Sequence, residues 1–267
     1  MHFDIESLRV QRGSRVRLAK LPTDDTGPFR DKEKAAELTA ENQRDIAKLQ
    51  QRLYAEGKRA LLIVLQGMDA SGKDGTVRSV FTGINPQGCS VVSFKAPSSN
   101  ELAHDYLWRV HSVVPARGMI AIFNRSHYES VLVERVRGLV PPAVWKRRYS
   151  HINEFERLLA DEGTTIVKFF LHISREEQGR RLKARLEDPE RRWKYDPRDL
   201  RDRRYWNEYQ AAYEDALARC STDYAPWYIV PADHKWFRNW VVSEVIARTL
   251  RRMDPRIPDS PRTDSQG

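Results

Sequence analysis

The chain has 267 residues, of which 40% are hydrophobic and 31% charged, and its mean hydropathy is -0.67, so that one soluble α/β domain with a sizeable core is expected. No apolar stretch approaches about 20 residues, and the N-terminus lacks an apolar core, so the sequence predicts neither a membrane span nor a secretory signal. Only two cysteines occur, which excludes a disulfide framework and a cysteine-based zinc site. We therefore expect a cytoplasmic protein. The net charge of +9 and the pI of about 9.6 favour anionic partners, with nucleic acid, another polyanion or a merely basic surface as the open readings.

The predicted elements alternate between helix and strand. Residues 1 to about 31 contain many turn-forming residues and predict an extended arm, and residues 254–267 predict a disordered tail. Between them, residues 32–253 predict one domain. Apolar periodicity and breakers predict helices at 32–56, 76–84, 98–114, 128–137, 141–161, 175–186, 205–220 and 236–253, and strands at 60–65, 89–94, 118–123, 164–171 and 227–231. This alternation predicts a three-layer α/β sandwich with a parallel five-stranded sheet.

The first predicted strand leads into GMDASGKDG, residues 67–75, which has the spacing of a phosphate-binding loop. Such a loop surrounds phosphate oxygens with backbone N–H groups, and the N-terminus of the following helix adds a favourable dipole. Lys73 supplies a cation near the outer phosphates. The residues predicted to bind phosphate in this loop are Gly67, Ala70, Ser71, Gly72, Asp74 and Gly75.

Two carboxylates make this loop unusual. Asp74 stands where Ser or Thr usually follows the lysine and binds magnesium. Asp69 lies inside a turn that would normally surround an anion, and we predict that it holds a Mg²⁺ or Mn²⁺ ion that bridges to the phosphates. The alternatives are that Asp69 bonds the loop's own amides, or that it orients or deprotonates the acceptor.

Cations follow the other predicted strands. Because ligands of parallel sheets bind beyond the carboxyl ends of the strands, we expect Lys95, Arg125, Arg181 and Arg185 to converge with Lys73 in one cleft. The arginines at 181 and 185 are four residues apart and share one helix face. The helix that carries them and the charged segment after it, about 175–204, predict a lid that excludes water during phosphoryl transfer.

The end of the third predicted strand departs from the usual pattern of phosphate-loop enzymes. An Asp commonly stands there and supports magnesium, whereas this chain has Asn124, which can bond a metal-bound water but carries no charge. Glu129 lies five residues further on. It either supplies the missing carboxylate or is a solvated helix residue.

Five motifs in order, GMDASGKDG, FKAP, FNRSHYE, HISREEQ and YAPWYIVPADHKWFRNW, resemble the polyphosphate kinase 2 family between about Arg30 and Met253. FNRSHYE, in place of the commoner FDRSWYN, most resembles the class III branch, which phosphorylates both AMP and ADP. The resemblance implies a fold similar to thymidylate kinase with a lid, and a reversible, Mg²⁺-dependent transfer of phosphoryl groups from inorganic polyphosphate to AMP and ADP. It also implies a homodimer or homotetramer.

The resemblance carries roles to single positions. It implies catalytic roles for Asp69, Lys73, Arg125 and Arg185. Because the Asp and Asn of the commoner motif become Asn124 and Glu129 here, we predict that Glu129 takes over metal support, together with Asp69 and Asn124. A long phosphate chain also accounts for the basic balance, and its groove is predicted to be lined by Arg109, His111 and Arg117.

Two other functions remain open. A nucleoside monophosphate kinase would use ATP as the donor, and a comparison of ATP with polyphosphate separates it from the first reading. A phosphate-loop regulator would bind nucleic acid without transferring phosphoryl groups. The sequence shows no helix-turn-helix, zinc-finger or RNA-binding signature that would support the regulator.

Overall fold

The computed structural model describes residues 3–190, 192–194 and 202–259. Its centre is a five-stranded sheet in the order β2-β3-β1-β4-β5, in which every pair of neighbouring strands is parallel. The strands are β1 (Ala60–Gln66), β2 (Cys89–Ser93), β3 (Ile120–Asn124), β4 (Thr164–His172) and β5 (Trp227–Pro231). The predicted fold class, an α/β sandwich with a parallel five-stranded sheet, is confirmed.

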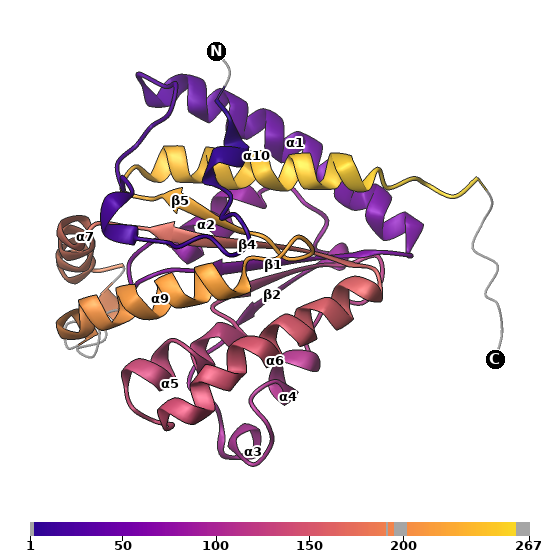
Figure 1. Ribbon diagram of the computed structural model, residues 1–267. Helices are drawn as coiled ribbons and strands as arrows, with labels where there is room; N and C mark the ends of the chain where they lie inside the picture. The colour runs from indigo at the N-terminus through magenta and orange to yellow at the C-terminus, as the bar shows by residue number, and fades with distance from the viewer. Residues whose placement is uncertain (1–2, 191, 195–201, 260–267) are drawn as a thin grey trace.

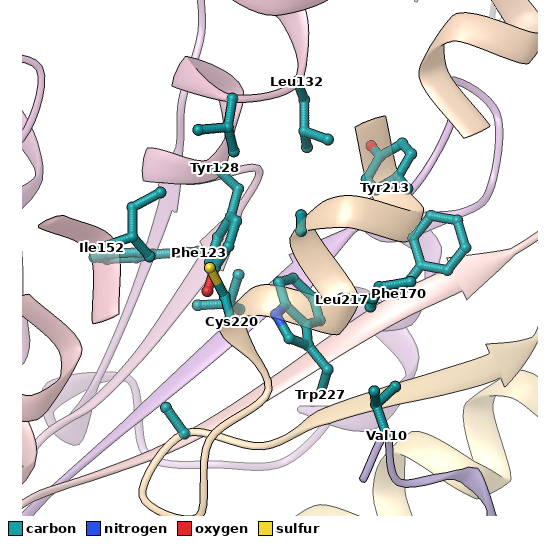
Figure 2. Packing of buried hydrophobic residues seen from close by; sticks show 14 of the residues in the cluster. Val10, Phe123, Tyr128, Leu132, Ile152, Phe170, Tyr213, Leu217, Cys220 and Trp227 are labelled. Atoms are coloured by element: carbon teal, nitrogen blue, oxygen red, sulfur yellow. The ribbon is translucent and has the colours of Figure 1, made fainter. Parts of the chain in front are cut away.

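Helices cover both faces of the sheet (Figure 1). Strand β1 is buried at every position, as expected of a central parallel strand covered on both sides. Its side chains alternate between two cores. Ile63 and Leu65 pack with α1 (Lys32–Glu56) and α10 (Lys235–Met253), whereas Leu62 and Val64 pack with α6 (Pro142–Asp161) and α9 (Trp206–Cys220). Figure 2 shows part of the second core, to which Tyr128 and Trp227 belong; their ring centroids lie 4.9 Å apart.

The long helices lie within a few residues of the predicted ranges. They are α1 (Lys32–Glu56), α2 (Lys73–Val80), α6 (Pro142–Asp161), α7 (Arg175–Glu187), α9 (Trp206–Cys220) and α10 (Lys235–Met253). Helix α1 begins at the Asp31 N-cap and ends at Gly57, which adopts a φ of 64°. Helix α2 begins three residues earlier than predicted, because the phosphate loop closes directly onto it with Gly72 as the N-cap.

Two predicted helices are broken into shorter turns. The range 98–114 contains α3 (Ser99–Leu102) and α4 (Trp108–His111), separated by a turn in which Asp105 accepts a hydrogen bond from the backbone of Leu107. The range 128–137 overlaps the 3₁₀ turn η4 (His127–Ser130) and contains α5 (Val133–Val136). Local side-chain bonds to the backbone compete here with a continuous helix. The remaining 3₁₀ turns are η1 (Ile5–Leu8), η2 (Leu18–Lys20), η3 (Pro86–Gly88), η5 (Arg192–Lys194) and η6 (Arg203–Tyr205).

The N-terminal arm is more firmly packed than a strip lying over the surface. Ile5 and Leu18 are fully buried, and the backbone of Leu18 donates to Glu214 of α9 over 2.7 Å. At the other end, residues 260–267 of the predicted tail lie outside the described residues, as do residues 191 and 195–201 of the predicted lid. None of the helices in the described ranges combines the length and apolar character needed to cross a bilayer.

Candidate active site

The phosphate loop follows the central strand β1, at the point where the strand order reverses and where open α/β sheets bind ligands. Gly67, Ala70 and Gly72 have φ angles of 154°, 60° and 103°, which fold the chain sharply before α2. The Lys73 ammonium donates to the carbonyls of Gly67 over 2.8 Å and Met68 over 3.2 Å, so the lysine spans the loop. The chain therefore turns sharply between β1 and α2, and the Lys73 side chain closes the loop from within.

Two glycines of the loop are required by space as well as by φ. A Cβ on Gly67 would lie 2.7 Å from Ser71 Oγ and 2.8 Å from the Leu171 carbonyl oxygen. A Cβ on Gly72 would overlap Nη1 of Arg238, which would have to shift. Gly75 differs because it lies inside helix α2, and a Cβ there would meet Nη2 of Arg238 at 3.6 Å, which is an ordinary van der Waals distance.

The loop lysine has unusual electrostatics. Burial and, as the second cause, the nearby Arg125 charge lower the pKa of Lys73 to about 8, although the carboxylates of Asp69 and Glu129 oppose both effects. Lys73 is thus buried, mostly charged at neutral pH and close to its proton-loss range. A bound phosphate would favour the charged form.

Arg125 joins two carboxylates at the edge of the loop. Its Nη2 lies 2.5 Å from Asp69 Oδ1, and its Nη1 lies 3.0 Å from Glu129 Oε2. The residue follows β3 with a φ of 63°, which is uncommon for a side chain other than glycine, and its backbone N–H donates to the Leu65 carbonyl over 3.0 Å. The charge of Glu129, and less that of Asp69, raises the pKa of Arg125 above its ordinary value despite burial, so the guanidinium stays charged.

Glu129 is held at the site by its surroundings. Its Oε1 accepts a hydrogen bond over 3.2 Å from Nε2 of Gln66, and Gln66 is the last residue of β1. The η4 turn that carries it is anchored in the core, where the fully buried Lys168 donates to Tyr128 Oη over 2.7 Å and to Glu156 over 2.5 Å. The side chain is therefore a fixed part of the site rather than a solvated helix residue.

The two departures from the common phosphate-loop pattern meet each other. Asn124 Nδ2 donates to Asp74 Oδ1 over 2.7 Å. The Asn124 amide thus supplies a hydrogen-bond donor to Asp74, the carboxylate that stands in place of the usual Ser or Thr. The carboxylates of Asp69, Asp74 and Glu129 all lie at the carboxyl edge of the sheet.

The two arginines of α7 that were predicted to bind phosphate, Arg181 and Arg185, have different surroundings. Arg181 Nη1 donates to the carbonyls of Ala70 over 3.1 Å and Ser71 over 3.0 Å, and its Nη2 donates to those of Ala232 and Asp233 over 2.6 and 2.8 Å. Its guanidinium therefore binds loop carbonyls. Arg185 lies one helical turn further along α7 and is half-buried.

The predicted polyphosphate groove divides between two edges of the sheet. Lys95 is exposed just after β2, and Arg109 donates to its carbonyl over 3.1 Å, so these two lie at the carboxyl edge with the loop. Arg117 and His111 instead line a cavity of about 400 Å³ beside the first residues of β1 and β4, at the amino edge. The structure does not bring these two residues to the phosphate loop.

Four site residues were not singled out from the sequence. Gln66 bonds Glu129, Gln178 donates to the Asp69 carbonyl over 3.1 Å, and Arg238 donates to that of Ser71 over 3.1 Å. Tyr213 is buried beside the cluster, where burial and then the Glu129 charge raise its pKa well above its ordinary value. The available signal for Arg238 was a charged residue between aromatic ones in the run WFRNW, and Gln66 ends an otherwise apolar strand.

The carboxylate oxygens at the site suit a hard divalent cation whose other ligands come mainly from the substrate. Within the described ranges, no group of three or more His, Cys, Asp and Glu side chains is arranged to hold a metal ion by itself. Mg²⁺ is commonly bound by one or two carboxylates together with substrate phosphates and water. Asp69 and Glu129 offer such oxygens, and Arg125 now neutralises both.

Comparison with known proteins agrees with this geometry. The family model described as polyphosphate kinase 2 matches residues 29–258. The chain is 54% identical to an AMP/ADP-polyphosphate phosphotransferase of Meiothermus ruber, over 98% of either chain, and 43% identical to an ADP-polyphosphate phosphotransferase of Rhodopseudomonas palustris, over 97% of this chain and 94% of the relative. The crystal structure of polyphosphate kinase 2 from Arthrobacter aurescens superposes with a TM-score of 0.93 at 41% identity, covering 100% of this chain and 95% of that one. The chain belongs to the polyphosphate kinase 2 family.

Proposed function

We propose that this protein transfers phosphoryl groups from inorganic polyphosphate to AMP and ADP, reversibly and with Mg²⁺ or Mn²⁺. The observation that carries the proposal is the meeting of a lysine-spanned phosphate loop with the cluster of Asp69, Arg125 and Glu129 at one edge of the sheet. The Meiothermus ruber relative, at 54% identity, is named for this activity. Phosphoryl transfer needs this combination of positioned phosphates and positive charge.

In the proposed mechanism the loop amides and Lys73 hold phosphate oxygens at the N-terminus of α2. Arg125 pairs with two carboxylates, and a phosphoryl group offers its guanidinium equivalent charged oxygens. The guanidinium then neutralises the charge that develops on the transferring group. Arg185 contributes from α7, as part of a lid that spans about 175–204.

Asp69 and Glu129 are the proposed carboxylate ligands of the divalent ion, with Asn124 bonding a water of its shell. The ion supplies charge neutralisation for the phosphates when it is bound. The Glu129 side chain supports this assignment because it is held at the site by Gln66 and Arg125. Orienting the acceptor is the alternative role of Asp69, whose backbone carbonyl within the loop accepts a hydrogen bond from Gln178.

The proposed path of the phosphate chain leaves the loop along Lys95 and Arg109, which share the carboxyl edge. Arg109 is held by a contact over the Phe94 ring, 5.2 Å from its centroid. Assembly as a homodimer or homotetramer is part of the proposal, and light scattering coupled to size-exclusion chromatography measures it directly.

The proposal is tested by incubating the protein with polyphosphate, Mg²⁺ and AMP and following nucleotides by chromatography. ADP is expected first and ATP after it. Lys73→Met should abolish product, whereas Lys146→Met, an exposed lysine on α6, should leave the rate unchanged. Equal rates for the two variants would refute the assigned role of the loop.

A further inference from the structure

Arg238 is an arginine buried directly behind the phosphate loop. It lies in the first turn of α10 and is only 2% exposed. Its Nη1 donates to the Ser71 carbonyl over 3.1 Å, and its Nε and Nη2 donate to Asn239 Oδ1 over 3.2 and 2.8 Å. A buried side chain with this many charged donors requires an explanation, because arginine is almost never fully buried without a pairing group.

No acidic side chain in the described part of the chain pairs with Arg238. Burial and, as the smaller cause, the positive charge of Arg181 together lower the pKa of Arg238 to about 9. The side chain therefore remains charged at neutral pH. Both arginines donate to the same Ser71 carbonyl, so two cations lie on one side of a single peptide group.

The orientation of that peptide matters for anion binding. In a planar trans peptide the C=O and the N–H point in opposite directions. Because the Ser71 carbonyl faces the two guanidiniums, the Gly72 N–H faces away from them, and within the described ranges it donates to no backbone carbonyl outside α2. A Cβ on Gly72 would overlap the Arg238 guanidinium, so a larger residue at this position would displace the arginine.

We propose that Arg238 is a positioning residue for phosphate binding, which holds the Ser71–Gly72 peptide with its N–H toward the phosphate and whose buried charge is compensated when an anion occupies the loop. This inference rests on the proposed function, since it assigns a task within the same site. A purely structural tie between α10 and the loop would make the side chain important for folding. Positioning instead makes it important for anion affinity, while its uncompensated charge costs stability in the free protein.

The test compares Arg238→Met and Arg238→Lys with Arg248→Met, a control on the same helix whose side chain pairs with Glu244 at the surface. The readouts are the thermal midpoint, the dissociation constant for tripolyphosphate by calorimetry, and kcat and KM for polyphosphate. Arg238→Met should keep or raise the thermal midpoint without ligand, bind tripolyphosphate about tenfold more weakly and raise KM more than it lowers kcat. The lysine variant should recover part of the affinity, and Arg248→Met should match the wild type.

A second measurement uses the wild-type chain, so it does not depend on how a variant folds. The Gly72 amide resonance is followed by NMR as tripolyphosphate is added, and a large shift with slowed exchange is expected. Tripolyphosphate affinity within twofold of wild type in Arg238→Met, or an unchanged Gly72 amide at saturation, would overturn the inference. Absence of phosphoryl transfer by wild-type protein that still binds tripolyphosphate in this way would contradict the proposed function and leave the inference standing.

Discussion

Asn124 donates its side-chain amide to Asp74 Oδ1 over 2.7 Å, and these are the two positions at which the chain departs from the common phosphate-loop pattern. The common pattern places Ser or Thr after the loop lysine and Asp at the end of the third strand. Here a carboxylate and an amide have taken those places and bond each other. The two exchanges are therefore coupled in space, and reverting only one of them should be harmful.

Asn124→Asp should place two carboxylates side by side where a hydrogen bond now lies. The free energy of unfolding should fall by about 1 kcal/mol in EDTA, because the lost bond is replaced by like-charge repulsion, and Mg²⁺ should restore part of the loss. Thermal denaturation with and without Mg²⁺ measures both effects. Asn124→Ala is the control, with a smaller loss and no rescue by Mg²⁺. Equal stability of Asn124→Asp and wild type in EDTA would show that the contact has no energetic weight.

The pKa of Lys73, lowered to about 8 by burial, predicts how phosphate binding depends on pH. Because the folded-state pKa lies below the ordinary 10.5, the charged form disfavours folding, and this destabilisation is relieved as pH rises from about 8 to 10.5. The charged form is the one that binds phosphate, so tripolyphosphate affinity should fall as pH rises through about 8. Calorimetry across this range measures the slope, and Lys73→Met should bind weakly without this step. A wild-type profile parallel to that of Lys73→Met would contradict the assignment.

Glu129→Gln should weaken metal support while keeping the shape of the side chain. The Mg²⁺ concentration for half-maximal rate should rise about tenfold, because one of the two proposed carboxylate ligands is lost. Glu134→Gln provides a control, since Glu134 pairs with Arg148 away from the loop. Initial rates at several Mg²⁺ concentrations give the comparison. A Glu129→Gln enzyme with wild-type magnesium dependence would remove Glu129 from the metal site.

The glycines of the loop should respond oppositely to alanine. Gly72→Ala should lower the free energy of unfolding by about 2 kcal/mol or more, because its φ of 103° disfavours a Cβ that would also overlap Arg238. Gly75→Ala should raise it by up to about 0.5 to 1 kcal/mol, since that position is helical and has room. Urea denaturation of both variants provides the measurement, and similar changes in both would contradict the geometry.

The sequence was sufficient for the sheet and the loop because their signals are local. Long apolar runs such as Ala60–Leu65 are typical of strands buried on both faces, and the glycine spacing of the loop is fixed by backbone geometry. The placement of His111 and Arg117 depends instead on the crossover from β2, which returns the chain to the amino edge before β3. Residue type and spacing do not reveal how far along that return a side chain lies.

The arginines illustrate the same limit. Sequence reasoning grouped Arg181 with the phosphate-binding cations, and the structure shows its guanidinium bonded to four backbone carbonyls. Arg238 belongs to α10, far along the chain from the loop that it contacts. Positive charge in a sequence indicates an anion site in general, whereas the side of the loop from which each cation acts depends on packing between distant elements.

The most direct test of the account is a comparison of phosphoryl donors with AMP as the acceptor. Initial rates of ADP formation are measured with Mg²⁺ and either polyphosphate or ATP at equal concentrations of transferable phosphate. The account predicts rapid ADP formation with polyphosphate, followed by ATP, and a much slower rate with ATP as the only donor. Efficient transfer from ATP with none from polyphosphate would contradict it and would identify a nucleoside monophosphate kinase.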